Sequence, residues 1–370
     1  MMNYIYQLED WPNFKWKTEE FLGLLSEARN LQGRLLGKMD SLGFELRNEA
    51  FLDTITLDVL KSSEIEGEIL NPEQVRSSVA RKLGLEFAGA VDSDRNVDGV
   101  VEMMLDATQK YYQPLSADRL FDWHAALFPT GRSGIRKITI ADWRKGTTGP
   151  MQVVSGSMGR EKVHFQAPDA KYVEREMIKF LDWLNDDRKN DLVMKAAIAH
   201  LWFITIHPFE DGNGRIARAI TDMILAQADK SEQRFYSMSA QIRIERKEYY
   251  EILEKTQKGN LDITEWMVWF LKCLINALKS SGEILSDILF KADFWKKNAE
   301  IKLNERQKQL LNKVLDGFEG KLTSAKWAKI AKCSKDSAIR DINDLIDKNI
   351  LEQEESGGRS TSYRLKSFHP

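Results

Sequence analysis

The 370-residue sequence contains only two cysteines, Cys273 and Cys333. Two thiols are too few for a disulfide framework or for a thiolate zinc site. No stretch approaches the roughly 20 apolar residues that a membrane-spanning helix needs. Residues 1–16 also lack the uninterrupted apolar run of a secretory signal. We therefore expect a cytoplasmic protein that does not act on a membrane.

An excess of charge of either sign is also absent. The 54 Lys and Arg residues against 56 Asp and Glu residues give a net charge of -2, so the total predicts no chain-wide affinity for nucleic acid. Hydrophobic residues make up 42% of the chain and charged residues 30%, which is typical of a globular protein and excludes a mostly disordered one. The length predicts two to three domains.

Apolar residues repeat at spacings of three and four along most of the chain, which predicts helices. The clearest repeats cover residues 21–36, 49–65, 100–111, 120–128 and 173–183. Residues 131–168 differ, because glycines and β-branched residues cluster there and predict a short β-hairpin at 151–165. The predicted fold class is therefore mainly α, a helical bundle with one β-hairpin.

Changes in composition suggest where the chain divides. Residues 92–98 are polar, and a shorter unit begins near residue 303. We predict an N-terminal helical extension at 1–95, a core at 96–285, a linker helix at 286–302 and a small domain at 303–370.

The most informative stretch is residues 207–218, HPFEDGNGRIAR. An apolar run at 194–206 precedes it and predicts a buried helix. Because Pro208 restricts the residue before it to an extended conformation, we expect that helix to end near His207. A second helix is expected from residue 216 onward. The glycines between the helices admit positive φ angles, and the free N–H groups at the start of the second helix make an anion site.

The polar residues of this stretch suit phosphoryl-transfer chemistry. Arg215 and Arg218 lie three positions apart on one helical face and could clamp two phosphates. Asp211 could hold Mg²⁺, which binds few carboxylates together with phosphate oxygens. His207 could accept a proton near neutral pH. The sequence thus predicts a nucleotide site with its own base.

This stretch resembles the signature of the Fic family, H-P-F-x-[DE]-G-N-G-R-x-x-R, and matches every specified position. The similarity extends over roughly residues 100–280, including 120–127 upstream and Tyr249-Tyr250 downstream. The resemblance implies a helical core with a β-hairpin flap and transfer of AMP from ATP to a Ser, Thr or Tyr hydroxyl of a target protein. Relatives with lysine in place of the second glycine transfer phosphate, so Gly214 favours adenylylation.

The resemblance also implies a role for each residue of the site. His207 would be the base, Asp211 would bind Mg²⁺, and Arg218 would grip the γ-phosphate. Four consecutive residues would hold the α- and β-phosphates: Gly212, Asn213, Gly214 and Arg215. Tyr250 would lie near the adenine, with a position in the buried core as the alternative. The flap at 151–165 would pair with an extended segment of the target.

A second pattern lies near the N-terminus. Ser62 and Glu66 are four positions apart on one helical face, and Gly67 is a good helix terminator. They match the inhibitory pattern of the Fic family, [ST]-x-x-x-E-[GN]. The resemblance implies that Glu66 pairs with Arg218 in cis and blocks productive docking of the γ-phosphate. A carboxylate at that arginine would also repel an incoming anion.

Residues 303–370 resemble a winged helix. Its second and third helices would cover 324–331 and 336–348, and the wing strands 350–352 and 362–365 would flank a loop at 356–360. The third helix carries four acidic residues against three basic ones, a poor face for DNA. We therefore favour a protein contact over DNA binding, which stays open.

Other functions are weighed beside adenylylation. The same site could remove AMP, with Glu66 orienting a water, or the chain could be a winged-helix regulator whose Fic part only senses nucleotide. The intact His207 argues against the regulator, because sensing needs no base. A metal hydrolase is disfavoured, since His200 and His207 have no third nitrogen or sulfur ligand nearby. Homodimerisation, self-modification and the identity of the target are left open.

Overall fold

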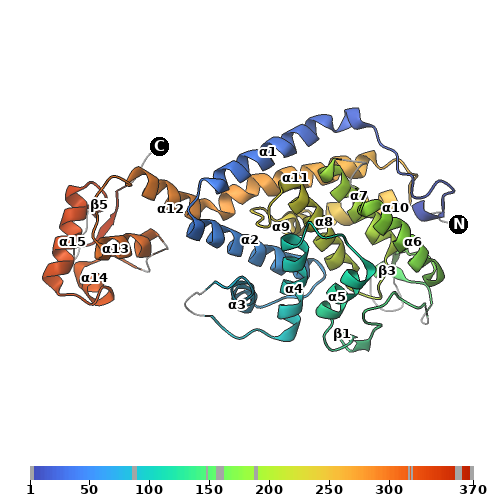
Figure 1. Cartoon of the computed structure of the whole chain (residues 1–370), viewed down its shortest axis with the longest axis horizontal. Helices are drawn as coiled ribbons and strands as arrows, with labels where there is room; N and C mark the ends of the chain where they lie inside the picture. Colours follow the sequence, from blue (N-terminus) through green and yellow to red (C-terminus); the bar gives the residue numbers. More distant parts are fainter. Residues whose placement is uncertain are drawn as a thin grey trace. The chain divides into compact units, whose positions relative to one another are not determined.

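The computed structural model describes residues 4–85, 90–146, 149–155, 162–186, 191–315, 317, 320–354 and 361–366. The chain divides into two compact units, Met1–Ile284 and Leu285–Pro370 (Figure 1). Both are mainly helical, so the predicted fold class is confirmed. Among the described residues, no helix combines the length and the apolar character that a bilayer span requires.

The first unit contains eleven helices in its described residues, and each helix predicted there from the apolar repeats is present. They are α1 (Leu22–Asp40), α2 (Phe44–Ile65), α3 (Pro72–Lys82), α4 (Arg95–Gln109), α5 (Ala117–Leu127), α6 (Ala170–Leu184), α7 (Leu192–Ile206), α8 (Asn213–Asp229), α9 (Met238–Ile244), α10 (Arg246–Gln257) and α11 (Thr264–Ile284). Short 3-10 turns occupy Ile5–Gln7 and Thr18–Glu20.

The polar stretch around residue 95 marks a helix start within the first unit. The Asp94 side chain accepts a hydrogen bond from the Val97 N–H at 2.9 Å and thereby caps α4. Segments on both sides of residue 95 belong to the same compact unit. The predicted extension therefore packs with the predicted core.

Helices α7 and α8 form the centre of this unit. All residues of α7 from Val193 to Ile206 are buried, as its apolar sequence on every face predicts. Most of α8 is buried too, including the polar residues Arg215, Arg218 and Asp222. The loop at 207–212, which contains part of the predicted site, is therefore held between two buried helices.

His200 ties three of these helices together. Its Nδ1 lies 2.9 Å from the Thr221 hydroxyl on α8, and its Nε2 lies 2.9 Å from the Tyr249 hydroxyl on α10. Burial lowers the pKa of His200 to about 3, with a smaller effect from the Arg218 charge. His200 is thus a neutral residue of the core with both nitrogens engaged.

The predicted hairpin is present in its described strands. β3 (Gln152–Ser155) and β4 (Lys162–Gln166) pair antiparallel, with a register irregularity between Val153 and Val154. The hairpin's tip, at 156–161, lies outside the described residues. A second, shorter pair joins β1 (Arg132–Ser133) and β2 (Arg136–Lys137).

The N-terminal aromatic residues pack on this hairpin and on the core. The rings of Tyr4 and Tyr6 lie 5.2 and 6.1 Å from the ring of Phe165 on β4. Further along the chain, the ring centroid of Trp11 lies 6.1 Å from that of Trp202 on α7. These contacts anchor a hairpin that would be marginally stable alone.

The second unit has the predicted order of helices and hairpin. Its elements are α12 (Ser286–Lys297), α13 (Glu305–Leu315), α14 (Ser324–Ile330), α15 (Lys335–Asp347), β5 (Leu351–Gln353) and β6 (Tyr363–Leu365). Phe294 from α12, the predicted linker helix, joins Trp327 and Leu345 in the core of this unit. The predicted loop at 356–360 lies outside the described residues.

One premise of the charge argument for α15 is wrong. Asp341 is buried, and its carboxylate accepts hydrogen bonds from the Arg306 guanidinium at 2.8 and 3.1 Å. The acidic residues of α15 therefore do not share one exposed face, because the period of the helix turns Asp341 inward toward α13.

The burial of His200 predicts a pH-dependent stability. A free histidine has a pKa near 6.5. Below that pH, His200 is therefore protonated in the unfolded chain but stays neutral in the folded protein. Between pH 7 and pH 5 this should remove about 2 kcal/mol of unfolding free energy. Chemical unfolding at the two pH values, followed by circular dichroism, measures the loss in the wild type.

His200→Gln should lose less stability over the same interval, since glutamine offers a donor and an acceptor and does not titrate. Equal slopes in the wild type and in His200→Gln would contradict the prediction.

Candidate active site

The loop between α7 and α8 turns through two left-handed residues. α7 ends at Ile206, and His207 follows with φ 53° and ψ 60°. Gly212, with φ 81°, precedes α8. A Cβ on Gly212 would also lie 2.9 Å from a ring carbon of Phe128, so this position needs glycine both for its backbone angle and for space. The predicted helix end near His207 is confirmed.

Asn213 holds this loop closed. Its side chain is buried, its Oδ1 accepts the Phe209 N–H at 2.9 Å, and its Nδ2 donates to the Phe209 carbonyl at 2.8 Å. What Asn213 can offer an anion is its main-chain N–H. The helical bonds of α8 begin with the Ile216 N–H to the Gly212 carbonyl at 3.0 Å, so the N–H groups of residues 213–215 precede that ladder. Such N–H groups at a helix start can bind an anion.

His207 has the protonation state of a base. Its Nδ1 lies 3.2 Å from the Ile204 carbonyl, which assigns the proton to Nδ1 and leaves the lone pair of Nε2 to accept another. Burial, with a smaller effect of the Arg144 charge, lowers the pKa of His207 to about 4 against the opposing effects of the Ile204 hydrogen bond and of the Glu66 and Asp211 charges. The imidazole is therefore neutral at pH 7.

Asp211 stands beside the helix start as a single carboxylate. Its Oδ1 accepts the Gly212 N–H at 2.6 Å, and its Oδ2 accepts the Ser133 hydroxyl. Within the described part of the chain, no group of three or more His, Cys, Asp or Glu residues could hold a metal ion. The donor set suits Mg²⁺ shared with phosphate oxygens and does not suit zinc.

Ser62, Glu66 and Arg218 lie together, as the N-terminal pattern predicted. Arg218 is 2% exposed, and its Nη2 lies 2.8 Å from Glu66 Oε1. The same guanidinium donates to the Ser62 hydroxyl at 2.9 Å and to the Ser62 carbonyl at 2.8 Å. Glu66 terminates α2, and Gly67 follows with φ 85°.

Gly214 provides the space that Glu66 occupies. A Cβ at this position would lie 2.1 Å from Glu66 Oε1 and 3.2 Å from Arg218 Nη1. The absence of a side chain at Gly214 therefore allows the Glu66–Arg218 ion pair to form against the first turn of α8.

Glu68 is a partner that the sequence analysis missed. Its Oε2 lies 2.6 Å from Arg215 Nη1, while the Arg215 guanidinium stacks 5.1 Å from the Phe128 ring. Arg215 and Arg218, at the start of α8, are thus both paired with carboxylates of residues that follow α2. The only available signal was the spacing of Glu68, two positions after Glu66.

Arg144 is a second residue that the sequence analysis missed. It is 4% exposed, its Nε donates to the His207 carbonyl at 2.8 Å, and its main-chain N–H donates to the Pro208 carbonyl at 2.9 Å. No motif marks Arg144, which lies more than 60 residues before the loop that it contacts.

Tyr250 and its neighbour Tyr249 face different surroundings. Tyr249 is buried against His200, whereas Tyr250 is 37% exposed, with the Arg246 guanidinium 5.5 Å from its ring. Partial burial raises the pKa of Tyr250, and the Glu66 charge raises it further. Tyr249, and not Tyr250, thus lies in the buried core.

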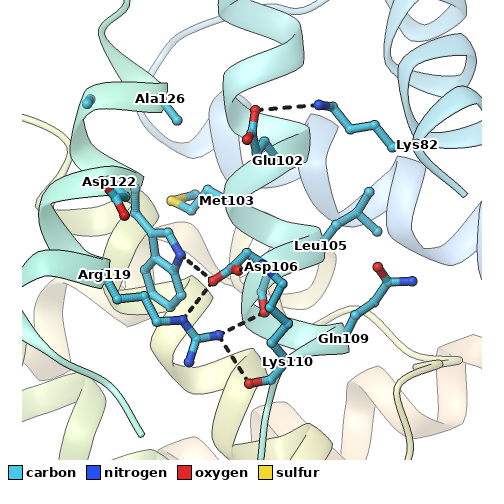
Figure 2. Close-up of a pocket in the computed structure, with 12 residues that line it drawn as sticks. Lys82, Glu102, Met103, Leu105, Asp106, Gln109, Lys110, Arg119, Asp122 and Ala126 are labelled. Carbon is cyan, nitrogen blue, oxygen red and sulfur yellow. Dashed lines mark hydrogen bonds and ion pairs between the residues drawn. The ribbon is translucent and has the colours of Figure 1, made fainter. Parts of the chain in front are cut away.

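A separate pocket of about 490 Å³ lies among α3, α4 and α5 (Figure 2). Asp106 is its central acid and accepts hydrogen bonds from Arg119 at 2.7 Å and from Trp123 at 2.8 Å. Arg119 also donates to main-chain carbonyl groups, as Figure 2 shows. The acidic and basic groups at the centre of this pocket are thus engaged with one another and with the main chain.

Comparison with known proteins agrees with the geometry of the loop. Residues 114–225 match the model of the Fic/DOC family. The chain carries a Fic/DOC-family domain. The resemblance found in the 207–218 motif is thereby confirmed. Residues 4–85 match another family model, described as a domain of unknown function (DUF4172).

Curated relatives share part of this Fic domain. Protein adenylyltransferase fic-1 of Caenorhabditis briggsae is 40% identical over 60 residues, which are 16% of this chain and 12% of that protein. Probable protein adenylyltransferase aq_aa38 of Aquifex aeolicus (strain VF5) is 30% identical over 100 residues, 27% of this chain and 29% of that protein. The chain thus matches less than a third of the length of either relative.

A solved structure shares the fold over nearly the whole chain. It is the crystal structure of a Fic family protein from Desulfovibrio desulfuricans G20, with a TM-score of 0.59 and 21% sequence identity. The match covers 96% of this chain and 98% of that one.

The contact between Gly214 and Glu66 predicts a coupling between the two positions. In an otherwise unhindered first turn of a helix, Gly→Ala adds up to about 1 kcal/mol of stability. In the wild type, Gly214→Ala should instead push Glu66 off Arg218 and give no gain or a loss. In the Glu66→Gly background, the same substitution should stabilise.

A double-mutant cycle of unfolding free energies measures this coupling, which we expect to be about 1 kcal/mol. Gly282→Ala on α11, where an added Cβ meets no atom within 4 Å, is the control and should not couple to Glu66. Additive effects at Gly214 and Glu66 would contradict the prediction.

Proposed function

We propose that the chain is a protein adenylyltransferase that transfers AMP from ATP to a Ser, Thr or Tyr hydroxyl of a target protein. The observation that carries the proposal is one loop that combines a neutral histidine, an uncapped helix N-terminus and two buried arginines. The relatives named protein adenylyltransferase support the same reaction class.

The reaction would use these groups as follows. The target hydroxyl oxygen attacks the α-phosphorus of ATP while Nε2 of His207 takes its proton. The bond from the α-phosphorus to the bridging oxygen breaks, and pyrophosphate leaves. The N–H groups of residues 213–215 and the two arginines would bind the negative charge of the phosphates.

Two buried nitrogens of these arginines support phosphate as the ligand. In the described structure, neither Nη1 of Arg218 nor Nε of Arg215 has a hydrogen-bond partner. Orphaned buried donors are costly, and phosphate oxygens would satisfy them. Asp211 would hold Mg²⁺, which would neutralise part of the phosphate charge. Tyr250, partly exposed beside Arg218, would face the adenine.

The same arginines carry the proposed inhibition. Glu66 occupies Arg218, so a γ-phosphate would have to displace a carboxylate and approach its negative charge. Ser62 holds the guanidinium in place through two hydrogen bonds, and Gly67 turns the chain after the helix. We extend this brake to Glu68, because its carboxylate occupies Arg215 in the same way.

The flap at 151–165 would receive the target. β3 and β4 form a two-stranded sheet in the described residues, so the outer edge of β3 is available for strand addition. Val154 on this strand is 49% exposed and would contact the target segment. For the winged-helix-like unit at 303–370 we propose a contact with protein. Its DNA binding, a homodimer, self-modification and the cytoplasmic location stay predictions.

We expect Glu66→Gly to increase the transfer of label from α-³²P-ATP to the chain itself or to a protein of a host lysate by about tenfold or more. Removing the carboxylate frees Arg218 for the γ-phosphate. His207→Ala in the same background should abolish labelling, because no base remains. Label from γ-³²P-ATP should not be transferred.

Glu64→Gly is the matched control, since Glu64 lies in the same last turn of α2 but pairs with Lys61 and Arg243. It should label like the wild type. Equal labelling by the wild type and Glu66→Gly would refute the brake, and labelling by His207→Ala would refute the base. Removal of AMP from a modified protein would instead indicate the reverse reaction.

We expect Glu68→Gln to tighten ADP binding by about threefold to tenfold, because Arg215 no longer has to exchange a carboxylate for phosphate. ADP lacks the γ-phosphate expected at Arg218, so Glu66→Gln should change ADP affinity less than Glu68→Gln does. Isothermal calorimetry with Mg²⁺ measures both. Unchanged ADP affinity in Glu68→Gln would remove Glu68 from the brake.

A further inference from the structure

Arg144 links the catalytic loop to the base of the flap. The residue lies before β3 in the chain and is almost fully buried. One guanidinium donates from Nε to the His207 carbonyl and from Nη2 to the Pro168 carbonyl, two residues past the end of β4. The Arg144 main-chain N–H adds a bond to the Pro208 carbonyl at 2.9 Å.

The backbone of His207 needs such support. A φ of 53° is unfavourable for a residue with a side chain. Strained conformations of this kind persist only where the surroundings determine them. Arg144 bonds the carbonyl groups of His207 and of Pro208, and so fixes the peptide units on the C-terminal side of the strained residue.

The buried guanidinium also contributes charge. Burial lowers the pKa of Arg144 to about 10, so it remains a cation at pH 7. Three charged groups act on His207: Arg144 disfavours its protonation, whereas Glu66 and Asp211 favour it. The Ile204 carbonyl accepts from its Nδ1. Arg144 therefore works with burial to keep the imidazole neutral.

We propose that Arg144 is a positioning residue that holds His207 in its left-handed conformation and ties it to the base of the flap. The inference deepens the proposed function, because it assumes that His207 accepts the proton of the target hydroxyl. Arg144 alone would thus align the base, His207, with the flap that would bind the target.

The test uses the full-length chain with two substitutions. Arg144→Lys retains the charge but loses the fork that reaches two carbonyl groups. Arg144→Met removes both. Arg119→Met is the matched control, since Arg119 is also largely buried and also bonds main-chain carbonyl groups, at Asp106, Lys110 and Gln113, outside the 207–218 loop.

Two measurements separate the contributions. The first is the initial rate of self-labelling from α-³²P-ATP in the Glu66→Gly background, with ATP affinity measured by calorimetry. The second is an NMR titration of His207 in nucleotide-free protein that retains Glu66, with the signal assigned by its loss in His207→Ala.

We expect Arg144→Lys to slow labelling on the order of 10- to 100-fold, since misplacing a reacting group by about 1 Å has such an effect. ATP affinity should change by less than about twofold. In Arg144→Met, the pKa of His207 should rise above its wild-type value of about 4, while burial still holds it below that of a free histidine. Arg119→Met should leave both the labelling rate and the titration unchanged.

Labelling by Arg144→Lys at the parental rate would overturn the positioning role. An unchanged His207 titration in folded Arg144→Met would overturn the electrostatic role, and an equal shift in Arg119→Met would show a general loosening. If the parent protein labels nothing, the proposed function fails, while the titration still decides whether Arg144 controls the state of His207.

Discussion

The site depends on one electrostatic constraint, the burial of the Arg218 cation in the core. A cation withdrawn from water needs a compensating anion, because an unpaired buried charge is far more costly than a paired one. Glu66 supplies that anion together with the oxygen atoms of Ser62. The carboxylate that would block ATP is thus also the group that neutralises the buried Arg218 cation.

This constraint organises the surrounding elements. α8 begins at Asn213 because Gly212 provides the left-handed turn, and its first residues bring Gly214 against Glu66. α2 ends at Ile65, and Glu66, directly after it, pairs with Arg218. The chain that follows places Glu68 beside Arg215. In the proposed function, phosphate groups would have to replace the carboxylates of Glu66 and Glu68 at the two arginines.

The sequence predicted the parts of the site that are local in the chain. The turn at His207, the helix start at Asn213 and the face shared by Ser62 and Glu66 all follow from short-range rules of backbone and helix geometry. Arg144 and Glu68 could not be predicted, because their partners lie 63 and 147 residues away and no spacing rule connects them. Asn213 is predicted to hold phosphate, but its side-chain amide bonds the main chain of Phe209, so the main-chain N–H is the group that it can offer an anion.

The N-terminal segment at 4–85 contacts the domain at several places, and two of these contacts would have opposite effects on the proposed activity. Its first residues support the flap strand through Tyr4 and Tyr6, and its later residues place Glu66 and Glu68 on the arginines. A chain without this segment would therefore lose the support of the flap together with the proposed inhibition. Under the proposed inhibition, a single substitution near position 66 would release Arg218 and keep the contacts of Tyr4 and Tyr6 with the flap strand.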